Sequence, residues 1–340
     1  MKIVRGLCLF LVMFCFFFGS SCKKEKNYAE LIKELPAFHL ENYPFFNPGI
    51  PLAERIVPAP DFLLSHIKAM DNTDVYETYF PAEKEIAMCK EYMDLLPESY
   101  KKVLRQRLVG IYFIDNFIGS GMADFVLDKD KTIYCNLFLN PETMKHDMTT
   151  WMSMRENTCF AEDDSGIKII LECGSKYTGL MYILLHETTH IVDYVYNFTP
   201  YVDIAVKEIM EKKDGHTPFT KGVWDTYDVP CKEYNFSHRT EITFYGLGGG
   251  PKINKRDAAI MYKGCGNTPF VSLYGSKNWA EDLAEFFTCY YFTSVLDQPY
   301  EILLYNGDML METFKPMERE NVKNRIPLFE EILHTVPEVL

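Results

Sequence analysis

The sequence predicts an α+β fold, in which a mixed β-sheet is followed by an active-site helix and by a second helix that carries another metal ligand. Three observations predict it. A strand-rich region follows an N-terminal group of helices. A long apolar run then contains the pattern His-Glu-x-x-His, and a later helical stretch places two glutamates four residues apart.

The composition is that of an acidic globular chain. It has 340 residues, with 35 basic and 48 acidic side chains and a net charge of −13. An aromatic share of 15% argues against a disordered chain. A nucleic-acid backbone is bound by basic surfaces, so we expect no nucleic-acid partner.

The N-terminus has the pattern of an export signal. Lys2 and Arg5 precede the apolar run Gly6–Phe18, which is too short to span a bilayer comfortably. Three small residues then precede Cys22 and a polar stretch, which resembles a bacterial lipoprotein cleavage site. The residue at Gly19 departs from the usual aliphatic one, and a plain secreted protein is the alternative.

We therefore expect residues 1–21 to be a removed lipoprotein signal peptide and Cys22 to be the acylated first residue. The mature chain would be exported and anchored by lipid in the bacterial cell envelope, at the outer membrane. Loss of the two basic residues of the leader takes its net charge from −13 to −15.

Seven cysteines follow Cys22, and an odd number leaves at least one free thiol. Export permits disulfides, but the sequence does not give their pairing. None of the seven stands in a Cys-x-x-Cys pair, so a cysteine zinc site is unsupported. They are Cys89, Cys135, Cys159, Cys173, Cys231, Cys265 and Cys289.

Residues 22–60 are predicted to be a tether and lead-in, because closely spaced prolines exclude long helices there. The remainder, 61–340, is predicted to be one domain. It begins with a helical part, 61–108, whose apolar spacing indicates amphipathic faces. The helices predicted there are Asp61–Met70, Ala82–Leu96 and Pro97–Leu108.

A strand-rich layer comes next, with β-branched and aromatic runs separated by turn residues. Its predicted strands are Val109–Phe117, Phe125–Leu127, Thr132–Asn140 and Gly166–Glu172. Residues 198–275 are predicted to be an irregular, proline-rich loop insertion. The triple glycine 248–250 lacks the Lys-Ser or Lys-Thr and the strand–helix frame of a phosphate loop. Helices are predicted over Ser276–Leu296, Met317–Arg325 and Pro327–His334.

The His-Glu-x-x-His pattern lies in a run without Gly or Pro from Leu180 to Phe198. On a helix, His186 and His190 are four residues apart and point the same way, so they can share one metal ion. Glu187 lies beside them, where it can hold and deprotonate a water molecule. The alternative is an accidental pair of histidines on a buried helix.

Glu281 and Glu285 share one face of the later helix, since they too are four residues apart. With Tyr274 upstream, the combined pattern resembles the catalytic domain of anthrax lethal factor and its gluzincin relatives. It is also similar to the lipid-anchored zinc metallopeptidases of Bacteroidota. The resemblance covers roughly residues 109–296.

This resemblance implies a zincin-like fold and a zinc ion bound by His186, His190 and Glu281. It implies that Glu285 accepts a hydrogen bond that orients a ligand histidine, and that Tyr274, seven residues before Glu281, stabilises an oxyanion. Two solvated acids on an exposed helix face, or exchanged roles for the two glutamates, are the alternatives.

Other polar residues carry weaker patterns. Asp193 shares the face of His190, where it either supports the metal ligands or pairs with a lysine or a backbone group. His216 and His238 lie in the insertion and are expected to be ordinary surface residues unless they enter the site as donors.

Together these patterns predict a membrane-anchored zinc metallopeptidase that hydrolyses peptide or protein substrates through a zinc-activated water. One alternative is a non-catalytic surface lipoprotein that binds glycan or peptide. Another is metal-dependent hydrolysis of a non-peptide bond. Zinc proteases hold extended peptides along a sheet edge, and Thr132–Asn140 is the candidate for that edge, with a buried strand as its alternative.

Overall fold

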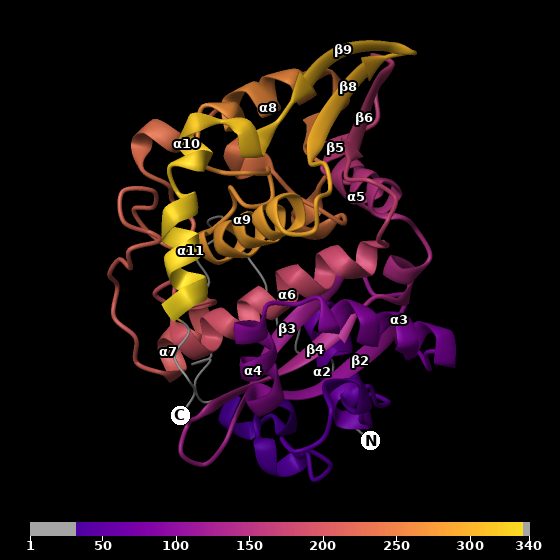
Figure 1. Cartoon of the computed structure of the whole chain (residues 1–340), viewed down its shortest axis with the longest axis vertical. Coiled ribbons are helices and arrows are strands. Elements are labelled where there is room, and N and C mark those ends of the chain that lie inside the picture. Colours follow the sequence, from indigo (N-terminus) through magenta and orange to yellow (C-terminus); the bar gives the residue numbers. More distant parts are fainter. Residues whose placement is uncertain (1–31, 336–340) are drawn as a thin grey trace, which may run out of the picture.

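The computed structural model describes residues 32–335, with side chains to residue 331. It confirms the predicted α+β class, since helices and three separate sheets alternate along the chain. One long helix, α6 (Gly179–Tyr196), runs through the middle of the molecule. Residues 32–139 lie below it in Figure 1, whereas residues 148–172 and most of residues 250–325 lie above it.

The lower half is built on a four-stranded mixed sheet of order β1-β2-β4-β3. Strands β2 and β4 are parallel, while β3 runs antiparallel to β4, and β1 runs antiparallel to β2. The strands are β1 (Glu77–Thr78), β2 (Leu108–Asp115), β3 (Gly121–Leu127) and β4 (Ile133–Leu139).

The edge of this sheet is β3, so the prediction that Thr132–Asn140 forms the edge is wrong. That segment is β4, which pairs with β2 on one side and β3 on the other. Its residues are almost all buried, as its dense β-branched and aromatic sequence required. Strand β3 is half-exposed along most of its length and includes Gly121 and Asp124, which weaken the strand signal of an edge.

Three helices cover the lower sheet close to their predicted positions. Each begins at or next to a proline or an acidic residue that suits the first helical turn, and each buries an apolar face. Before them, the described part of the lead-in, residues 32–60, is helical at 32–34 and then forms short 3-10 turns, in agreement with the prolines that exclude long helices. The helices are α2 (Asp61–Met70), α3 (Glu83–Asp94) and α4 (Glu98–Arg107).

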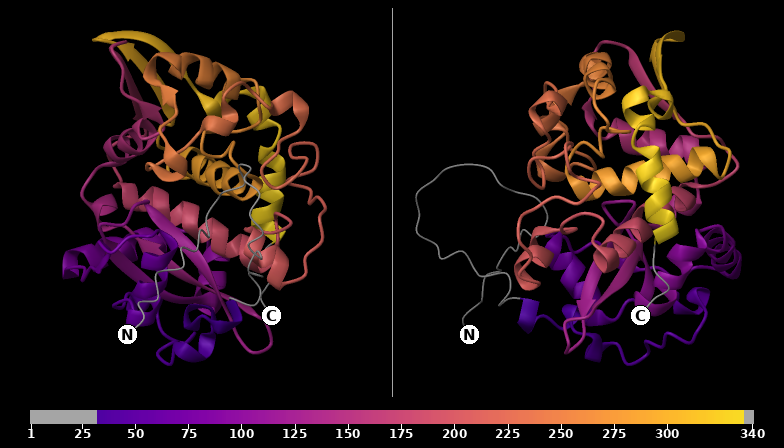
Figure 2. Two further views of the ribbon diagram at one scale, coloured as in Figure 1. Left: turned by 180° about the vertical axis from the view of Figure 1, so that it is seen from behind. Right: turned by 60° about the vertical axis from the view of Figure 1, so that its left-hand side comes forward.

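The upper half contains elements that the sequence analysis did not predict. Helix α5 (Met148–Asn157) starts at Asp147, whose side chain accepts the N–H of Thr150 at 2.8 Å. A hairpin of β8 (Glu301–Asn306) and β9 (Met309–Phe314) pairs with the predicted strand β6 (Ile167–Glu172). The second ligand-bearing helix is α9 (Trp279–Ser294), which crosses above α6 in both views of Figure 2.

Helices α5 and α6 approach closely because α6 begins with a glycine. A Cβ on Gly179 would lie 2.4 Å from the Trp151 side chain, closer than any real contact. This approach brings Arg155, near the end of α5, to the middle of α6. It is the structural basis of the polar network described below.

The region 198–275 is mainly irregular, as predicted, but it includes two helices and a short strand. Gly246 begins a turn at φ 75°, and Gly248 and Gly249 also have positive φ, which agrees with a turn at the triple glycine. The regular elements are α7 (Ile204–Ile209), β7 (Ile253–Asn254), which pairs with β5 (Phe160–Ala161), and α8 (Ala258–Gly266).

The C-terminal part closes the upper half with two helices, α10 (Glu320–Lys323) and α11 (Ile326–Thr335). Arg325, between them, donates two hydrogen bonds to Asp282 at 2.9 and 2.8 Å, and Trp224 Nε1 donates a third at 2.9 Å. Asp282 is completely buried, so these three donors hold α9 against the end of the chain.

Some predictions lie outside the described residues, namely the leader 1–21 and the lipidation of Cys22. Within residues 32–335, no helix combines the length and apolar character needed to cross a bilayer. The seven cysteines that follow Cys22 are all free thiols.

Candidate metal centre

Helix α6 presents the His-Glu-x-x-His pattern from a buried position. Every residue from Gly179 to Tyr194 is buried, because the apolar run packs against the sheet on one side and α9 on the other. The helix ends at Asn197, which adopts the left-handed conformation with φ 57°. His186, Glu187 and His190 are 3%, 5% and 9% exposed, so the centre is shielded from bulk water.

Helix α9 brings Glu281 to the same place. The side chain of Asn278 caps this helix by accepting the N–H groups of Ala280 and Glu281, each at 3.0 Å. This cap fixes Glu281 in the first turn, where it faces α6. Glu285 follows one turn later on the same face, as the four-residue spacing predicts.

The structure brings the three predicted ligands together. His186 Nε2 lies 3.1 Å from Glu281 Oε2 and 3.2 Å from His190 Nε2, and His190 Nε2 lies 3.5 Å from Glu281 Oε2. Within the described residues, this is the one group of three or more His, Cys, Asp or Glu side chains whose ligand atoms converge, all within 4.8 Å.

These separations match a tetrahedral metal site. Ligand atoms about 2.0–2.2 Å from a tetrahedral zinc ion are about 3.3–3.5 Å apart, so all three distances lie within a few tenths of an ångström of the expected spacing. Two imidazole nitrogens and one carboxylate oxygen are the donor set of many catalytic zinc sites. His186, His190 and Glu281 can therefore hold zinc with little rearrangement.

Burial and charge give the two histidines different pKa values. Burial lowers the pKa of His186 to about 4, although its hydrogen bond with Glu281 opposes this effect. Burial also disfavours the charged form of His190, but the hydrogen bond and charge of Glu281 outweigh it and raise the pKa of His190 to about 9. The pKa of Glu281 is held low, because both histidines outweigh the opposing effect of burial.

Glu187 lies beside the ligands without being one of them. Burial raises the pKa of its carboxyl group to about 7, and a hydrogen bond from the backbone N–H of Ala123 on β3 opposes that rise. A carboxylate with a pKa near neutrality suits a general base at neutral pH. Its contact with Ala123 also places the acid at the exposed edge of the sheet.

Glu285 forms a network behind His186. Its Oε1 lies 3.1 Å from His186 Nδ1, although the pair does not have the alignment of a hydrogen bond. Arg155 Nη2 donates to Oε1 at 3.2 Å, the Tyr182 hydroxyl also donates to Oε1, and the Ser272 hydroxyl donates to Oε2 at 2.6 Å. Three donors therefore fix a completely buried carboxylate against the ring of His186.

The solvated-acid alternative for this pair of glutamates is therefore excluded, since Glu285 has no exposed surface. Burial raises the pKa of Glu285 to about 7, while the positive charge of Arg155 opposes the rise. Burial would in turn lower the pKa of Arg155, but the charge of Glu285 reverses that effect and raises it. Each group therefore stabilises the charge of the other.

Tyr274 also lies near His186 and next to Arg155. Their ring centroids are 5.8 Å apart, and Arg155 Cζ lies 4.5 Å from the centroid of the Tyr274 ring. Burial, with the nearby charge of Glu281, raises the pKa of the phenol well above its usual value. The hydroxyl therefore stays protonated at neutral pH, as a hydrogen-bond donor requires.

Asp193 has a different set of partners from the metal ligands. Its carboxylate accepts the backbone N–H of Thr199 at 2.7 Å and also the Thr199 hydroxyl. This matches the backbone-partner alternative, in which Asp193 ties the end of α6 to the following segment. His190 Nδ1 is buried and has no hydrogen-bond partner among the described residues.

The two histidines of the insertion are both exposed. His216 lies on the surface, and His238 Nδ1 pairs with Glu241 Oε1 at 2.8 Å. Both agree with the expectation of ordinary surface residues.

Four residues that shape the centre were not predicted from the sequence: Arg155, Tyr182, Ser272 and Gly121. Tyr182 stands four residues before His186 on α6, which is a helical signal that was readable from the sequence. Arg155 gave no such signal, because it becomes a neighbour only through the packing of α5 on α6.

Gly121 begins β3 and lies directly against α6. A Cβ there would be 2.7 Å from Ile183 Cγ1, 3.0 Å from the Phe138 carbonyl oxygen and 3.2 Å from Glu187 Cγ. The absent side chain thus allows the edge strand to reach Glu187.

We expect Gly121→Ala to push β3 away from Glu187, because the backbone and the packed Ile183 side chain leave no room for a methyl group. The free energy of unfolding should fall by about 1–3 kcal/mol, measured by urea denaturation, and any turnover should fall with it. Gly119→Ala is the control, because its Cβ would lie 3.6 Å from the nearest atom. Equal stability of the two variants would contradict this account of Gly121.

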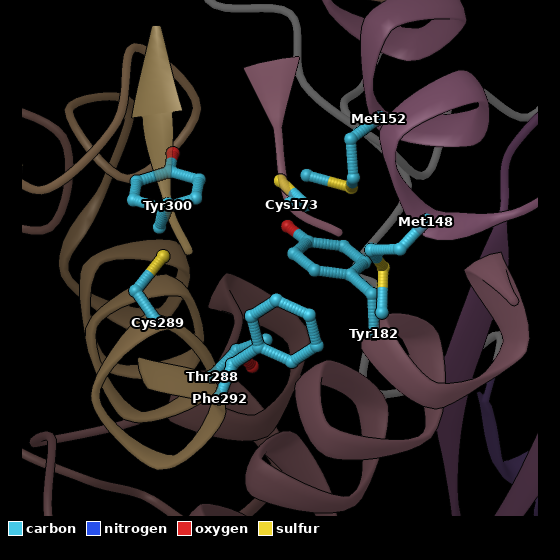
Figure 3. A pocket seen from close by; sticks show the side chains of 8 residues that line it. All are labelled: Met148, Met152, Cys173, Tyr182, Thr288, Cys289, Phe292 and Tyr300. Atoms are coloured by element: carbon cyan, nitrogen blue, oxygen red, sulfur yellow. The ribbon is translucent and has the colours of Figure 1, made fainter. Parts of the chain in front are cut away.

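A small cavity of about 10 Å³ lies beside the Glu285 network, with Tyr182 in its wall. Figure 3 shows its lining of sulfur-containing, aromatic and hydroxyl side chains. It has room for about one water molecule, so it is a small packing gap rather than a substrate pocket. Its lining residues are Met148, Met152, Cys173, Tyr182, Thr288, Cys289, Phe292 and Tyr300.

Comparison with known proteins found no matching family model, no matching curated protein and no matching solved structure.

Proposed function

We propose that the chain is a zinc metallopeptidase with a zincin-like fold of the gluzincin type. The observation that carries the proposal is the convergence of His186, His190 and Glu281 at the spacing of a tetrahedral zinc site. Two further features support it. Glu187 stands beside the ligands at the sheet edge, and Glu285 is fixed behind His186.

In this proposal each residue has one task. Zinc supplies Lewis-acid polarisation of the scissile carbonyl group and lowers the pKa of water towards 7. Glu187 accepts the proton of the attacking water and delivers it to the leaving amine. Tyr274 donates a hydrogen bond to the oxygen that becomes negative. Glu285 holds the ring of His186 in its ligating orientation.

The substrate would lie along β3, whose outer edge reaches Glu187 through Gly121 and Ala123. An extended peptide can add to such an edge by main-chain hydrogen bonds. The far end of β3 is less open, because His39 of the lead-in bridges to Leu127. The available edge therefore runs from Gly121 towards Phe125.

Zinc content of the chain 23–340 tests this proposal. We expect about one zinc per chain for the wild type, loss of the metal with Glu281→Ala, and weaker binding by about 10–100-fold with Glu285→Ala. Metal analysis after dialysis measures this, with circular dichroism to confirm folding. A folded wild-type chain that retains no zinc would sink the enzyme proposal and favour a binding lipoprotein.

We also propose that the mature chain is held in the cell envelope by lipid on Cys22. The sequence around the leader is the support, since a charged start, a short apolar core and small residues precede this cysteine. Labelling of expressing bacteria with a fatty-acid analogue should mark the wild type but not Cys22→Ser. Equal labelling of both would refute the anchor and leave zinc binding untouched.

A further inference from the structure

Lys277 carries a charge near the candidate metal centre that no side chain of the described residues neutralises directly. It lies in the loop between Tyr274 and α9, and its Nζ is 5.8 Å from the centroid of the Tyr274 ring. Of the buried cations, Arg155 and Arg325 each have a carboxylate partner, and Arg55 and Arg239 donate to backbone carbonyl oxygens. Within residues 32–335, by contrast, Lys277 Nζ takes part in no ion pair and no side-chain hydrogen bond.

The backbone around Lys277 is held in place, so its free ammonium group does not reflect a loose loop. The Lys277 N–H donates to the Tyr274 carbonyl at 3.1 Å, and the Ser276 hydroxyl donates to the Leu273 carbonyl at 2.7 Å. Arg239 Nη1 donates to the Ser276 carbonyl at 2.6 Å. A fixed backbone presents the ammonium group in a defined direction.

An unpaired cation in a partly buried position costs free energy. Burial lowers the pKa of Lys277, and the negative charge of Glu281 is the largest opposing effect. Glu281 is also a proposed zinc ligand, so its charge is committed to the metal when the centre is loaded. Lys277 then lacks a counter-charge, although the chain as a whole is acidic.

We propose that Lys277 binds a carboxylate of the substrate, so that the enzyme prefers peptides with a carboxylate close to the scissile bond. This inference rests on the proposed peptidase function. Tyr274 lies against His186 and Lys277 lies against Tyr274, so the carboxylate would sit within one or two residues of the cleaved bond. It belongs either to an Asp or Glu side chain or to the C-terminus of the peptide.

The first test needs no turnover. Isothermal titration compares acetohydroxamate with succinate monohydroxamate, which adds one carboxylate, on zinc-loaded wild type and Lys277→Met. We expect succinate monohydroxamate to bind the wild type about 10-fold more tightly than acetohydroxamate, which corresponds to one charge-assisted hydrogen bond. Lys277→Met should lose that advantage and still bind acetohydroxamate and zinc as the wild type does.

The second test separates the two sources of the carboxylate. Three sets of peptides are compared by kcat/KM: acidic peptides with amidated C-termini, neutral peptides with free C-termini, and neutral amidated peptides. Preference for the first set assigns a side-chain carboxylate, and preference for the second assigns the C-terminus. In Lys277→Met, KM should rise about 10-fold for the preferred set and change little for the neutral amidated peptides.

Stability distinguishes a ligand-binding lysine from a structural one. Lys277→Met should unfold at the same or higher urea concentration than the wild type, because an unpaired and partly buried charge is removed. Lys232→Met, at an exposed position, is the control for loss of a positive charge.

Equal affinity of the wild type for the two hydroxamates would overturn the inference. So would a fall in kcat/KM in Lys277→Met that is equal for all three sets of peptides. Zinc retention with no cleavage of any peptide would instead refute the peptidase proposal, and the hydroxamate titration would still decide the role of Lys277.

Discussion

Glu187→Gln will abolish most peptide hydrolysis and leave about one zinc ion bound per chain. The change replaces a carboxylate by an amide of the same shape, so the site keeps its packing and loses its proton acceptor. A general base contributes about 10²–10⁴-fold to the rate, and we expect kcat to fall within that range. Zinc content and kcat, measured on the same preparations, separate the loss of the base from the loss of the metal.

Glu156→Gln is the matched control for this experiment. Glu156 is also a buried glutamate, but its carboxylate accepts the Tyr262 hydroxyl at 2.7 Å and is not among the converging ligand atoms. We expect kcat within a few-fold of the wild type for Glu156→Gln. If Glu187→Gln kept full activity, another group would have to accept the proton of the attacking water, and the proposed mechanism would be wrong.

The candidate metal ligands were readable from the sequence in part, because helical spacing places each pair on one face. His186 and His190 are one turn apart on α6, and Glu281 and Glu285 are one turn apart on α9. Once both helices form, each pair must share a face. Spacing within one helix gives no information on the neighbours of that helix. The expectation that α6 and α9 face each other therefore came from the family resemblance.

Three of the four strands of the lower sheet were predicted, but β1 and the strand order were not. The predicted strand 166–172 is β6, which pairs with β8 in a separate sheet. The β-propensity of residues 132–140 predicted a strand. Their nearly continuous apolar sequence also indicates burial on both faces, which is typical of an interior strand. The true edge, β3, has a glycine at its start because α6 passes too close for a side chain. That requirement depends on the position of a distant helix, which local sequence does not encode.

The hairpin β8–β9 was missed for a related reason. Met309, Leu310 and Met311 are exposed in succession, so β9 lacks the alternation of polar and apolar residues that predicts a half-buried strand. Its strand conformation comes from pairing with β8. Tertiary pairing here overrides a weak local pattern.

Arg155→Met is expected to have the largest combined effect on stability and metal binding. The substitution leaves the carboxylate of Glu285 buried and without its counter-ion, and breaking such a buried pair costs about 3–5 kcal/mol. It also removes a cation that lies 4.5 Å from the Tyr274 ring centroid and 5.0 Å from that of Tyr182. Zinc affinity should fall by about 10–100-fold, because Glu285 then no longer holds His186 in one orientation.

Arg105→Met is the control, because the ion pair of Arg105 has nearly the same length as that of Arg155 but is exposed to solvent. Arg105 Nη1 lies 3.1 Å from Glu98 Oε1, and these two side chains are 50% and 58% exposed. Arg155 Nη2 lies 3.2 Å from Glu285 Oε1, and these two side chains are 3% and 0% exposed. Loss of the exposed pair should change the free energy of unfolding by less than about 1 kcal/mol and leave zinc binding unchanged. Urea denaturation and zinc titration with a competing chelator measure both quantities. If the two variants behaved alike, Arg155 would not support the metal centre, and Tyr182 and Ser272 would suffice to hold Glu285 against His186.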